Sequence, residues 1–152
     1  MQERLRALGW DDFEARLQRQ LTTQYGSRLK LQSGPISSVV RDALHAYLEG
    51  KLDAIDTIPV ETGGTAFQRA VWQELRRIPP GTTMSYRDLA TRIDRPKAVR
   101  AVGHANGANP ICIVVLCHRL IGSDGSLTGY GGGLPRKRWL LNHEGAAQPS
   151  LI

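Results

Sequence analysis

Residues 111–119 read Ile-Cys-Ile-Val-Val-Leu-Cys-His-Arg, and the interpretation of the whole chain starts from this stretch. A β-branched apolar run of this kind predicts a buried strand. The run ends in Cys117, His118 and Arg119, which place a base and a cation beside a thiol, and both help a thiol to lose its proton. Because adjacent strand residues point to opposite faces, His118 would reach Cys117 through a water molecule or after a turn. The tripeptide also fits a buried structural cysteine followed by polar surface residues, since free cysteine is among the most buried residue types.

Length and composition predict a cytoplasmic globular protein with a polyanionic partner. The chain has 152 residues, of which 41% are hydrophobic, and its net charge is +6. No apolar run approaches the roughly 18 residues of a membrane helix, and the N-terminus lacks the pattern of a signal peptide. Two cysteines form no disulfide framework. Cys112 and Cys117 are an odd number of residues apart, so on a regular strand they would face opposite sides, which argues against a disulfide and against a zinc site with His118 and His143.

The segment before this stretch predicts a helix-turn-helix. Thr65 is expected to cap a helix over 66–77, and Ser85 a second helix over 86–93. A tight turn at 94–96 then leads into a helix over 97–106, and two short helices around such a turn are typical of a DNA-binding unit. Between Ser85 and Arg119 there are six basic residues against two acidic ones. Small residues around Arg100 permit close approach to a nucleic-acid groove, although a merely solvated basic face remains the alternative.

The remaining segments predict two parts of the chain and a tail. Residues 1–62 are expected to form a small N-terminal subdomain with helices starting near Asp11 and Ser37. Residues 63–147 would form the second domain, and residues 148–152 a frayed tail. The second domain is expected to end with a glycine-rich loop over 128–133, whose only large side chain is Tyr130, and a last helix over 136–143.

Four motifs in one order carry a family resemblance. They are Arg100-Ala101-Val102-Gly103, Asn109-Pro110-Ile111, Cys117-His118-Arg119 and Leu140-Leu141…His143-Glu144-Gly145. With them the chain resembles the O6-alkylguanine-DNA alkyltransferases, also called methylated-DNA–protein-cysteine methyltransferases, densely from residue 65 to 145 and more loosely before that. The resemblance implies an α+β fold, with a small, abbreviated N-terminal α/β subdomain followed by a mostly helical, winged-helix-like domain that carries the helix-turn-helix and an active-site strand.

The resemblance also implies the reaction. An alkylguanine base would be flipped out of duplex DNA, and its alkyl group would pass irreversibly to Cys117, once per molecule, without a cofactor, a metal or an obligate protein partner. The expected partner is double-stranded DNA bearing O6-alkylguanine, with O4-alkylthymine as a second candidate lesion.

Each matching position takes a role by resemblance. Cys117 would accept the alkyl group, His118 would act as a base through a water molecule, and Glu144 would orient that histidine. Asn109 would brace the turn before the active-site strand, and Tyr86 would push the target phosphate or donate to guanine N3. Arg119 is expected to tie the structure together. The remaining expected site residues are the DNA contacts Arg100, Ala101, Gly103, Ala105 and Lys97 and the base-pocket residues Tyr130, Gly131, Leu116 and Leu120.

The sequence departs from the family at two places. Leu116 stands where the family has proline, so a backbone N–H and conformational freedom return beside the reactive cysteine. Family members carry a β-hairpin or small sheet ahead of the first helix, so the resemblance predicts an abbreviated or truncated N-terminal subdomain for this chain. Two other functions remain open: a non-catalytic sensor of alkylated bases, and a basic helix-turn-helix protein with an inert core cysteine. Thiol reactivity distinguishes them from an alkyltransferase.

Overall fold

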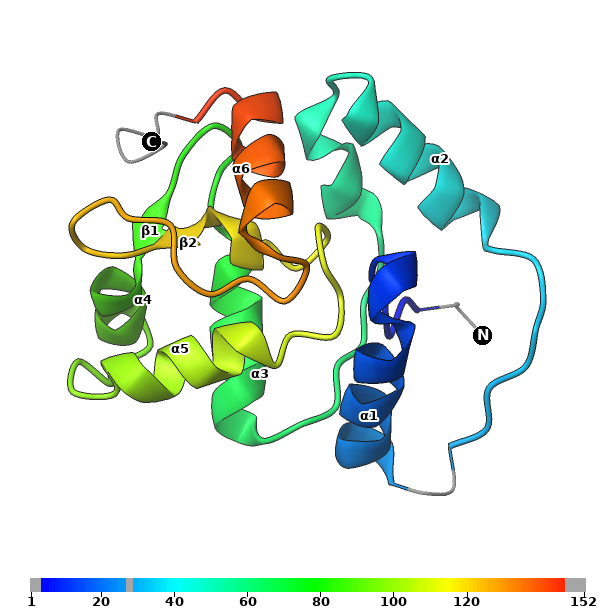
Figure 1. Ribbon diagram of the computed structural model, residues 1–152, viewed down its shortest axis with the longest axis horizontal. Helices are drawn as coiled ribbons and strands as arrows, with labels where there is room; N and C mark the ends of the chain where they lie inside the picture. Colours follow the sequence, from blue (N-terminus) through cyan, green and yellow to red (C-terminus); the bar gives the residue numbers. More distant parts are fainter. Residues whose placement is uncertain (1–3, 27–28, 147–152) are drawn as a thin grey trace.

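Helices surround a two-stranded parallel sheet in the computed structural model, which describes residues 4–26 and 29–146 (Figure 1). The predicted tail at 148–152 lies outside the described residues. The α+β class is confirmed, because the sheet pairs β1 with β2 in a register that sets Met84 opposite Leu120. The elements in order are η1 (Asp11–Phe13), α1 (Glu14–Tyr25), α2 (Ser38–Leu48), η2 (Leu52–Thr57), α3 (Ala66–Leu75), β1 (Met84–Ser85), α4 (Tyr86–Arg92), α5 (Val99–Gly107), η3 (Cys117–Arg119), β2 (Leu120–Ile121) and α6 (Leu134–His143).

Side-chain caps fix the starts of α3 and α4, as the sequence predicts. The Thr65 hydroxyl accepts from the Gln68 N–H at 3.1 Å, and the Gln68 side chain accepts from the Thr65 N–H at 3.0 Å. The Ser85 hydroxyl accepts from the Asp88 N–H at 3.0 Å. Each cap stabilises its helix by about 1 kcal/mol. Because α4 and α5 are joined by a short turn through residues 93–98, the predicted helix-turn-helix is confirmed.

The core lies between α3, the helix-turn-helix and α6. Its centre is Trp72, which is 1% exposed and whose Nε1 donates to the carbonyl oxygen of Ala105 at 2.8 Å. This bond holds α3 directly against α5. Around it lie further fully buried side chains: Leu75, Leu89, Val102, Ile111, Leu120, Leu140 and Leu141. None of the helices among the described residues is long and apolar enough to cross a membrane.

The predicted strand over 111–116 is wrong, because this segment folds as a turn. Ile111 makes a single bridge to Leu8, and the Val115 N–H then donates back to the Ile111 carbonyl at 3.0 Å. Ile113 has a φ of 72°, in the left-handed region that strands do not use. The side chain of Asn109 replaces the missing ladder: its Nδ2 donates to the carbonyls of Ile111 and Val115, and its Oδ1 accepts from the Ile111 N–H. The turn thus depends on one amide side chain.

The N-terminal segment is attached to the same turn. Leu5 bridges Val60, and three residues later Leu8 donates to the Pro110 carbonyl at 2.9 Å and accepts from the Cys112 N–H at 2.9 Å. These isolated bridges are the only β pairing described for this part of the chain outside β1 and β2. In Figure 1, α1 and α2 lie on one side of the group formed by α3, α5 and the sheet.

Candidate active site

Cys117, His118 and Arg119 form η3, directly after the turn that Asn109 closes. All three side chains are buried, with Cys117 only 3% exposed. The tripeptide is followed at once by β2, whose pairing with β1 connects it to the start of the helix-turn-helix. The reactive tripeptide therefore lies between a turn and a sheet, in a part of the fold that both constrain.

Glu144 at the end of α6 receives four hydrogen bonds from three residues. Arg119 donates from Nε to Oε1 at 2.7 Å and from Nη2 to Oε2 at 2.9 Å. His118 Nε2 lies 2.8 Å from Oε2, and the Tyr47 hydroxyl of α2 donates to Oε2 at 2.6 Å. Burial alone would raise the pKa of Glu144, but the bonds from His118 and Arg119 outweigh it and lower that pKa to about 2. The carboxylate is therefore charged at every physiological pH.

The imidazole of His118 is held as a neutral base. Complete burial lowers its pKa, against the opposing effect of Glu144. Because Nε2 faces a carboxylate, the proton of the neutral ring belongs on Nε2, which leaves the lone pair on Nδ1. Nδ1 is buried and has no hydrogen-bond partner among the described residues. An unsatisfied buried base atom on the residue next to Cys117 can accept a proton from a bridging water molecule.

The two cysteines lie together, so the prediction that they face apart is wrong. The expectation assumed a regular strand, whereas the turn brings Cys112 back to hydrogen-bond with Cys117. The bond to Cys112 and the burial raise the pKa of the Cys117 thiol well above its usual value, and the pKa of Cys112 is lowered by the same bond. At rest Cys117 is therefore a protonated thiol that needs a base. Both cysteines are free.

Lys137 of α6 is a buried cation beside this thiol that the sequence interpretation missed. Its side chain is 0% exposed, and its Nζ donates to the carbonyls of Leu120 and Thr128. Burial lowers its pKa to about 8, against an opposing effect of Cys117. Lys137 and Asn109 both lower the pKa of Cys117, so they counteract part of the burial. A signal did exist, because Lys137 precedes Leu140 and Leu141 at the three- and four-residue spacing of one helix face.

Tyr47 was also missed, and no local pattern could have found it. It lies in the predicted N-terminal subdomain, 97 residues before Glu144. Burial, and then the bond to Glu144, raise its pKa, so its hydroxyl remains a donor.

Tyr86 and Tyr130 approach the site from two sides. The Tyr86 hydroxyl, at the start of α4, donates to the Thr128 carbonyl at 3.1 Å. The Thr128 hydroxyl in turn donates to the Tyr86 hydroxyl at 3.2 Å. Burial raises the pKa of Tyr86, so the hydroxyl keeps its proton. Tyr130 packs against the core, and its pKa is raised by burial and then by the charges of Cys117 and Cys112. Both phenols are therefore proton donors near the thiol.

The predicted DNA contacts divide into exposed and buried residues. Arg100, Ala101 and Lys97 are exposed at the start of α5 and in the turn before it. Gly103 is half-buried beneath the ring of Tyr86, where a Cβ would lie 3.8 Å from the ring. The prediction for Ala105 is wrong: it is 2% exposed, and its carbonyl accepts from Trp72 Nε1, because this part of α5 packs against α3.

Two of the predicted base-pocket residues belong to the core. Leu116 is 1% exposed and Leu120 is 0% exposed, so neither presents a surface to a base in this structure, and this prediction is wrong. The reason is that the turn and β2 direct both side chains inward. Gly131 is half-buried against the guanidinium of Arg16, which a Cβ would contact at 2.2 Å. The glycine loop is thus closed over α1 of the N-terminal segment.

Leu116 itself adopts a conformation that proline can adopt. Its φ of −81° lies close to the about −65° of proline, and the Cys117 N–H donates across it to the Val115 carbonyl at 2.8 Å. Its own N–H donates to none of the described residues.

We therefore expect Leu116→Pro to fold, with a free energy of unfolding within about 2 kcal/mol of the parent, because no hydrogen bond is lost. The matched control is Val115→Pro, which removes the bond from the Val115 N–H to Ile111 and should cost about 3 kcal/mol or more. Urea unfolding of the two variants measures the difference. Equal losses would show that Leu116 does not tolerate proline.

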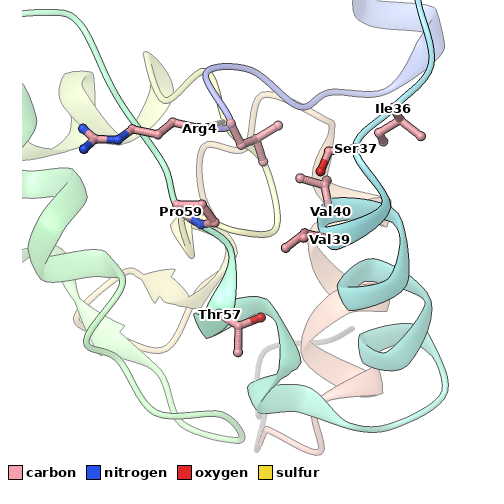
Figure 2. A pocket seen from close by; sticks show the side chains of 8 residues that line it. Arg4, Ile36, Ser37, Val39, Val40, Thr57 and Pro59 are labelled. Atoms are coloured by element: carbon pink, nitrogen blue, oxygen red, sulfur yellow. The ribbon is translucent and has the colours of Figure 1, made fainter. Parts of the chain in front are cut away.

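A hollow of about 570 Å³ opens elsewhere, between the start of α2 and the segment after η2 (Figure 2). Ile36, Val39 and Val40 line it on one side, with Thr57 and Pro59 on the other. None of the residues described above around Cys117 and Glu144 lines it. The chemistry is therefore concentrated at Cys117 and not in this apolar hollow.

The arrangement defines a class of protein. A buried thiol, a histidine held by a carboxylate and an adjacent helix-turn-helix make a DNA-binding protein with a nucleophilic cysteine. Within residues 4–26 and 29–146, no group of three or more His, Cys, Asp or Glu side chains could hold a metal ion.

Comparisons with known proteins identify the family. Residues 66–146 match the DNA-binding domain of the 6-O-methylguanine DNA methyltransferases. A methylated-DNA–protein-cysteine methyltransferase of Salmonella typhimurium is 51% identical over 145 residues, which cover 95% of this chain and 85% of the relative. One from Haemophilus influenzae is 51% identical over 110 residues, 72% of this chain and 62% of the relative.

Solved structures agree. The Mycobacterium tuberculosis OGT in complex with DNA superposes with a TM-score of 0.67 at 50% identity, covering 71% of this chain and 66% of that one. The O6-methylguanine-DNA methyltransferase of Pyrococcus kodakaraensis has a TM-score of 0.71 at 29% identity, covering 87% of this chain and 76% of that one. The chain therefore belongs to the methylated-DNA–protein-cysteine methyltransferase family of DNA-repair proteins, which transfer an alkyl group from DNA to a cysteine.

Proposed function

We propose that this chain takes the alkyl group of O6-alkylguanine in duplex DNA onto the Sγ of Cys117, once per molecule. The observation that carries the proposal is the His118–Glu144 pair, with Nε2 and Oε2 2.8 Å apart and a buried Nδ1 that has no partner among the described residues, on the residue that follows the protonated thiol of Cys117. A thiol with a raised pKa is unreactive until a base takes its proton, and this pair supplies the base.

The first step is proton removal. A water molecule between the Cys117 thiol and His118 Nδ1 passes the thiol proton to the imidazole, and the Glu144 carboxylate stabilises the imidazolium that forms. Arg119 and Tyr47 hold the carboxylate in place through their own bonds to it. The ammonium of Lys137 stabilises the thiolate. The thiolate is thus generated within the buried site, where the base and the cation are held.

The second step is transfer. The thiolate attacks the alkyl carbon, the new S–C bond forms, and the C–O6 bond breaks with its electron pair going to guanine. Guanine then needs a proton, and the Tyr86 hydroxyl, whose raised pKa keeps it protonated, donates at guanine N3. The thioether does not hydrolyse back, so each molecule reacts once.

The helix-turn-helix delivers the lesion. A base inside the duplex is inaccessible to Cys117, so it must be extruded, which costs a few kcal/mol of stacking. Arg100 is exposed at the start of α5, where its side chain can occupy the gap that the base leaves. The neighbouring Ala101 and half-buried Gly103 leave room for the DNA backbone.

Intact-protein mass spectrometry tests the proposal. After incubation with a duplex containing one O6-methylguanine, the protein should be heavier by a single methyl group, and Cys117→Ser should remain unmodified. A parallel duplex with O4-methylthymine tests the second candidate lesion. An unmodified protein that still prefers the lesion would show a sensor, and an unmodified protein without preference would show a DNA-binding domain with an inert cysteine; either result contradicts the proposal.

A further inference from the structure

Two hollows continue the exposed face of α5 toward the N-terminal helix α1. The first, of about 650 Å³, has Arg100, Gly103 and His104 of α5 on one wall and Arg16 and Gln20 of α1 on the other. The second, of about 600 Å³, shares Arg16, Gln20 and Ala108 with the first. It runs on to Arg19, Thr23, Gln24 and the start of α3. Together they form a groove, here called the α1 groove, that begins at the face of α5 presented to DNA.

The α1 groove is cationic along its length. Arg16, Arg19 and Arg100 contribute guanidinium groups, and no Asp or Glu lines either hollow. Arg19 and Arg100 are exposed, and neither side chain has an ion pair or hydrogen bond within the described part of the chain. The N-terminus of α3, a helix of ten residues, adds the positive end of its dipole at the far end. Unpaired guanidinium groups along a polar groove are suited to phosphates.

The wall formed by α1 is fixed to α5 and does not depend on bound DNA. Arg16 Nη2 donates to the Gly107 carbonyl at 2.8 Å, and Gln20 and Gln24 donate to the carbonyls of Gly107 and Ala108 at 3.4 Å each. These three residues recur every four positions, so they form one stripe of α1. The acceptors are the last carbonyls of α5, which an adjacent cation stabilises. The stripe anchors the groove and leaves Arg19 free.

We propose that the α1 groove is a second DNA contact, in which Arg19 binds a backbone phosphate beyond the nucleotides that α5 covers. The inference rests on DNA as the partner and extends the interface from the helix-turn-helix to the N-terminal segment. Arg19 has no other partner among residues 4–26 and 29–146, and the groove leads to it from Arg100, which lies at the start of α5. The contact adds affinity without sequence preference, since it is made to phosphate alone.

Binding to an unmodified duplex, measured by fluorescence anisotropy over a range of salt concentrations, tests the inference. The logarithm of the binding constant falls linearly with the logarithm of the salt concentration, and loss of one phosphate contact makes this negative slope shallower by about 0.9. The same loss corresponds to roughly eightfold weaker binding at about 0.1 M salt. Arg19→Ala should show both changes, and Arg19→Lys should keep most of the affinity. The matched control, Lys51→Ala, removes an exposed cation after α2, outside both hollows, and should leave the slope unchanged.

A shorter duplex locates the contact. On a duplex trimmed so that it ends within the region covered by α5, Arg19→Ala and the parent should bind equally. Equal affinities and slopes for Arg19→Ala and Lys51→Ala on the long duplex would overturn the inference. The duplex in this binding test carries no lesion. A negative result here is therefore distinct from a negative result in the alkyl-transfer test, which uses the parent protein and DNA that contains O6-methylguanine.

Discussion

Glu144→Gln is expected to lower the free energy of unfolding by about 3 to 5 kcal/mol, because it leaves the buried guanidinium of Arg119 without its counter-charge. Arg119 is 1% exposed and has the Ile78 carbonyl as its other acceptor, so water cannot replace the carboxylate. The same change should slow alkyl transfer at least about a hundredfold, because His118 loses the group that orients it and stabilises its charged form. Urea unfolding and single-turnover transfer measure the two effects.

The control is Glu49→Gln, which changes an exposed carboxylate and should alter neither quantity. Should Glu144→Gln fail to fold, Tyr47→Phe removes one bond to the same carboxylate and should cost about 1 to 3 kcal/mol. A Glu144→Gln protein with parent stability and rate would contradict the role given to this cluster.

The lowered pKa of Glu144 predicts that the folded state loses stability in acid. The pKa of Glu144 is about 2 in the folded protein and 4.5 ordinarily. The charged carboxylate therefore stabilises the folded state relative to the unfolded state. This stabilises the fold by about 3 kcal/mol above pH 4.5, and the contribution is lost as the pH falls from 4.5 toward 2. His118 acts in the same direction, because its lowered pKa favours the folded state only while the imidazole is neutral.

Lys137→Met is expected to slow alkyl transfer at least about tenfold and to change the free energy of unfolding by less than about 2 kcal/mol. The slower rate follows because the variant lacks the cation that lowers the pKa of Cys117. The small stability change follows from two opposing effects: the desolvation of a buried ammonium is removed, and the carbonyls of Leu120 and Thr128 lose their donor. Arg138→Met, at the exposed neighbouring position, is the control.

The pH dependence of stability distinguishes Lys137 from a merely packed side chain. Its pKa is about 8 when folded and 10.5 ordinarily, so between these values the unfolded chain binds the additional proton. The stability of the parent should therefore rise, relative to Lys137→Met, by about 3 kcal/mol as the pH increases from 8 to 10.5. Parallel stability curves for the two proteins would contradict the shifted pKa.

The starts of α3 and α4 could be predicted from the sequence because their signals are local, whereas α5 and α6 begin two residues away from their predicted starts. The caps at Thr65 and Ser85 each involve a side chain and an N–H three residues later, within one helical turn. The α5 helix was harder, since its small residues occur on both its exposed and its buried sides. Composition alone could not show that Ala105 faces Trp72 while Ala101 faces outward.

The turn at 111–116 and the bond from Tyr47 to Glu144 could not be predicted, because their causes are distant or unusual. A run of Ile and Val favours a strand, and it was the bonds from Asn109 and the left-handed Ile113 that overrode this preference. Cys112 and Cys117 lie close together because of that turn, so the prediction that they face apart was wrong for the same reason. Tyr47 reaches the site only through tertiary packing, whereas the helical spacing of Lys137 to Leu140 and Leu141 did indicate that it is buried.

We expect the bond between Tyr47 and Glu144, which joins residues 97 positions apart, to form late in folding. Contacts between residues far apart in sequence form late, because the chain must first close a long loop. The caps and short turn of the helix-turn-helix, by contrast, close within a few residues. We therefore expect a chain that has formed only its local structure to have its helix-turn-helix before Glu144 has all of its hydrogen bonds, since the bond from Tyr47 forms only when α2 and α6 have met.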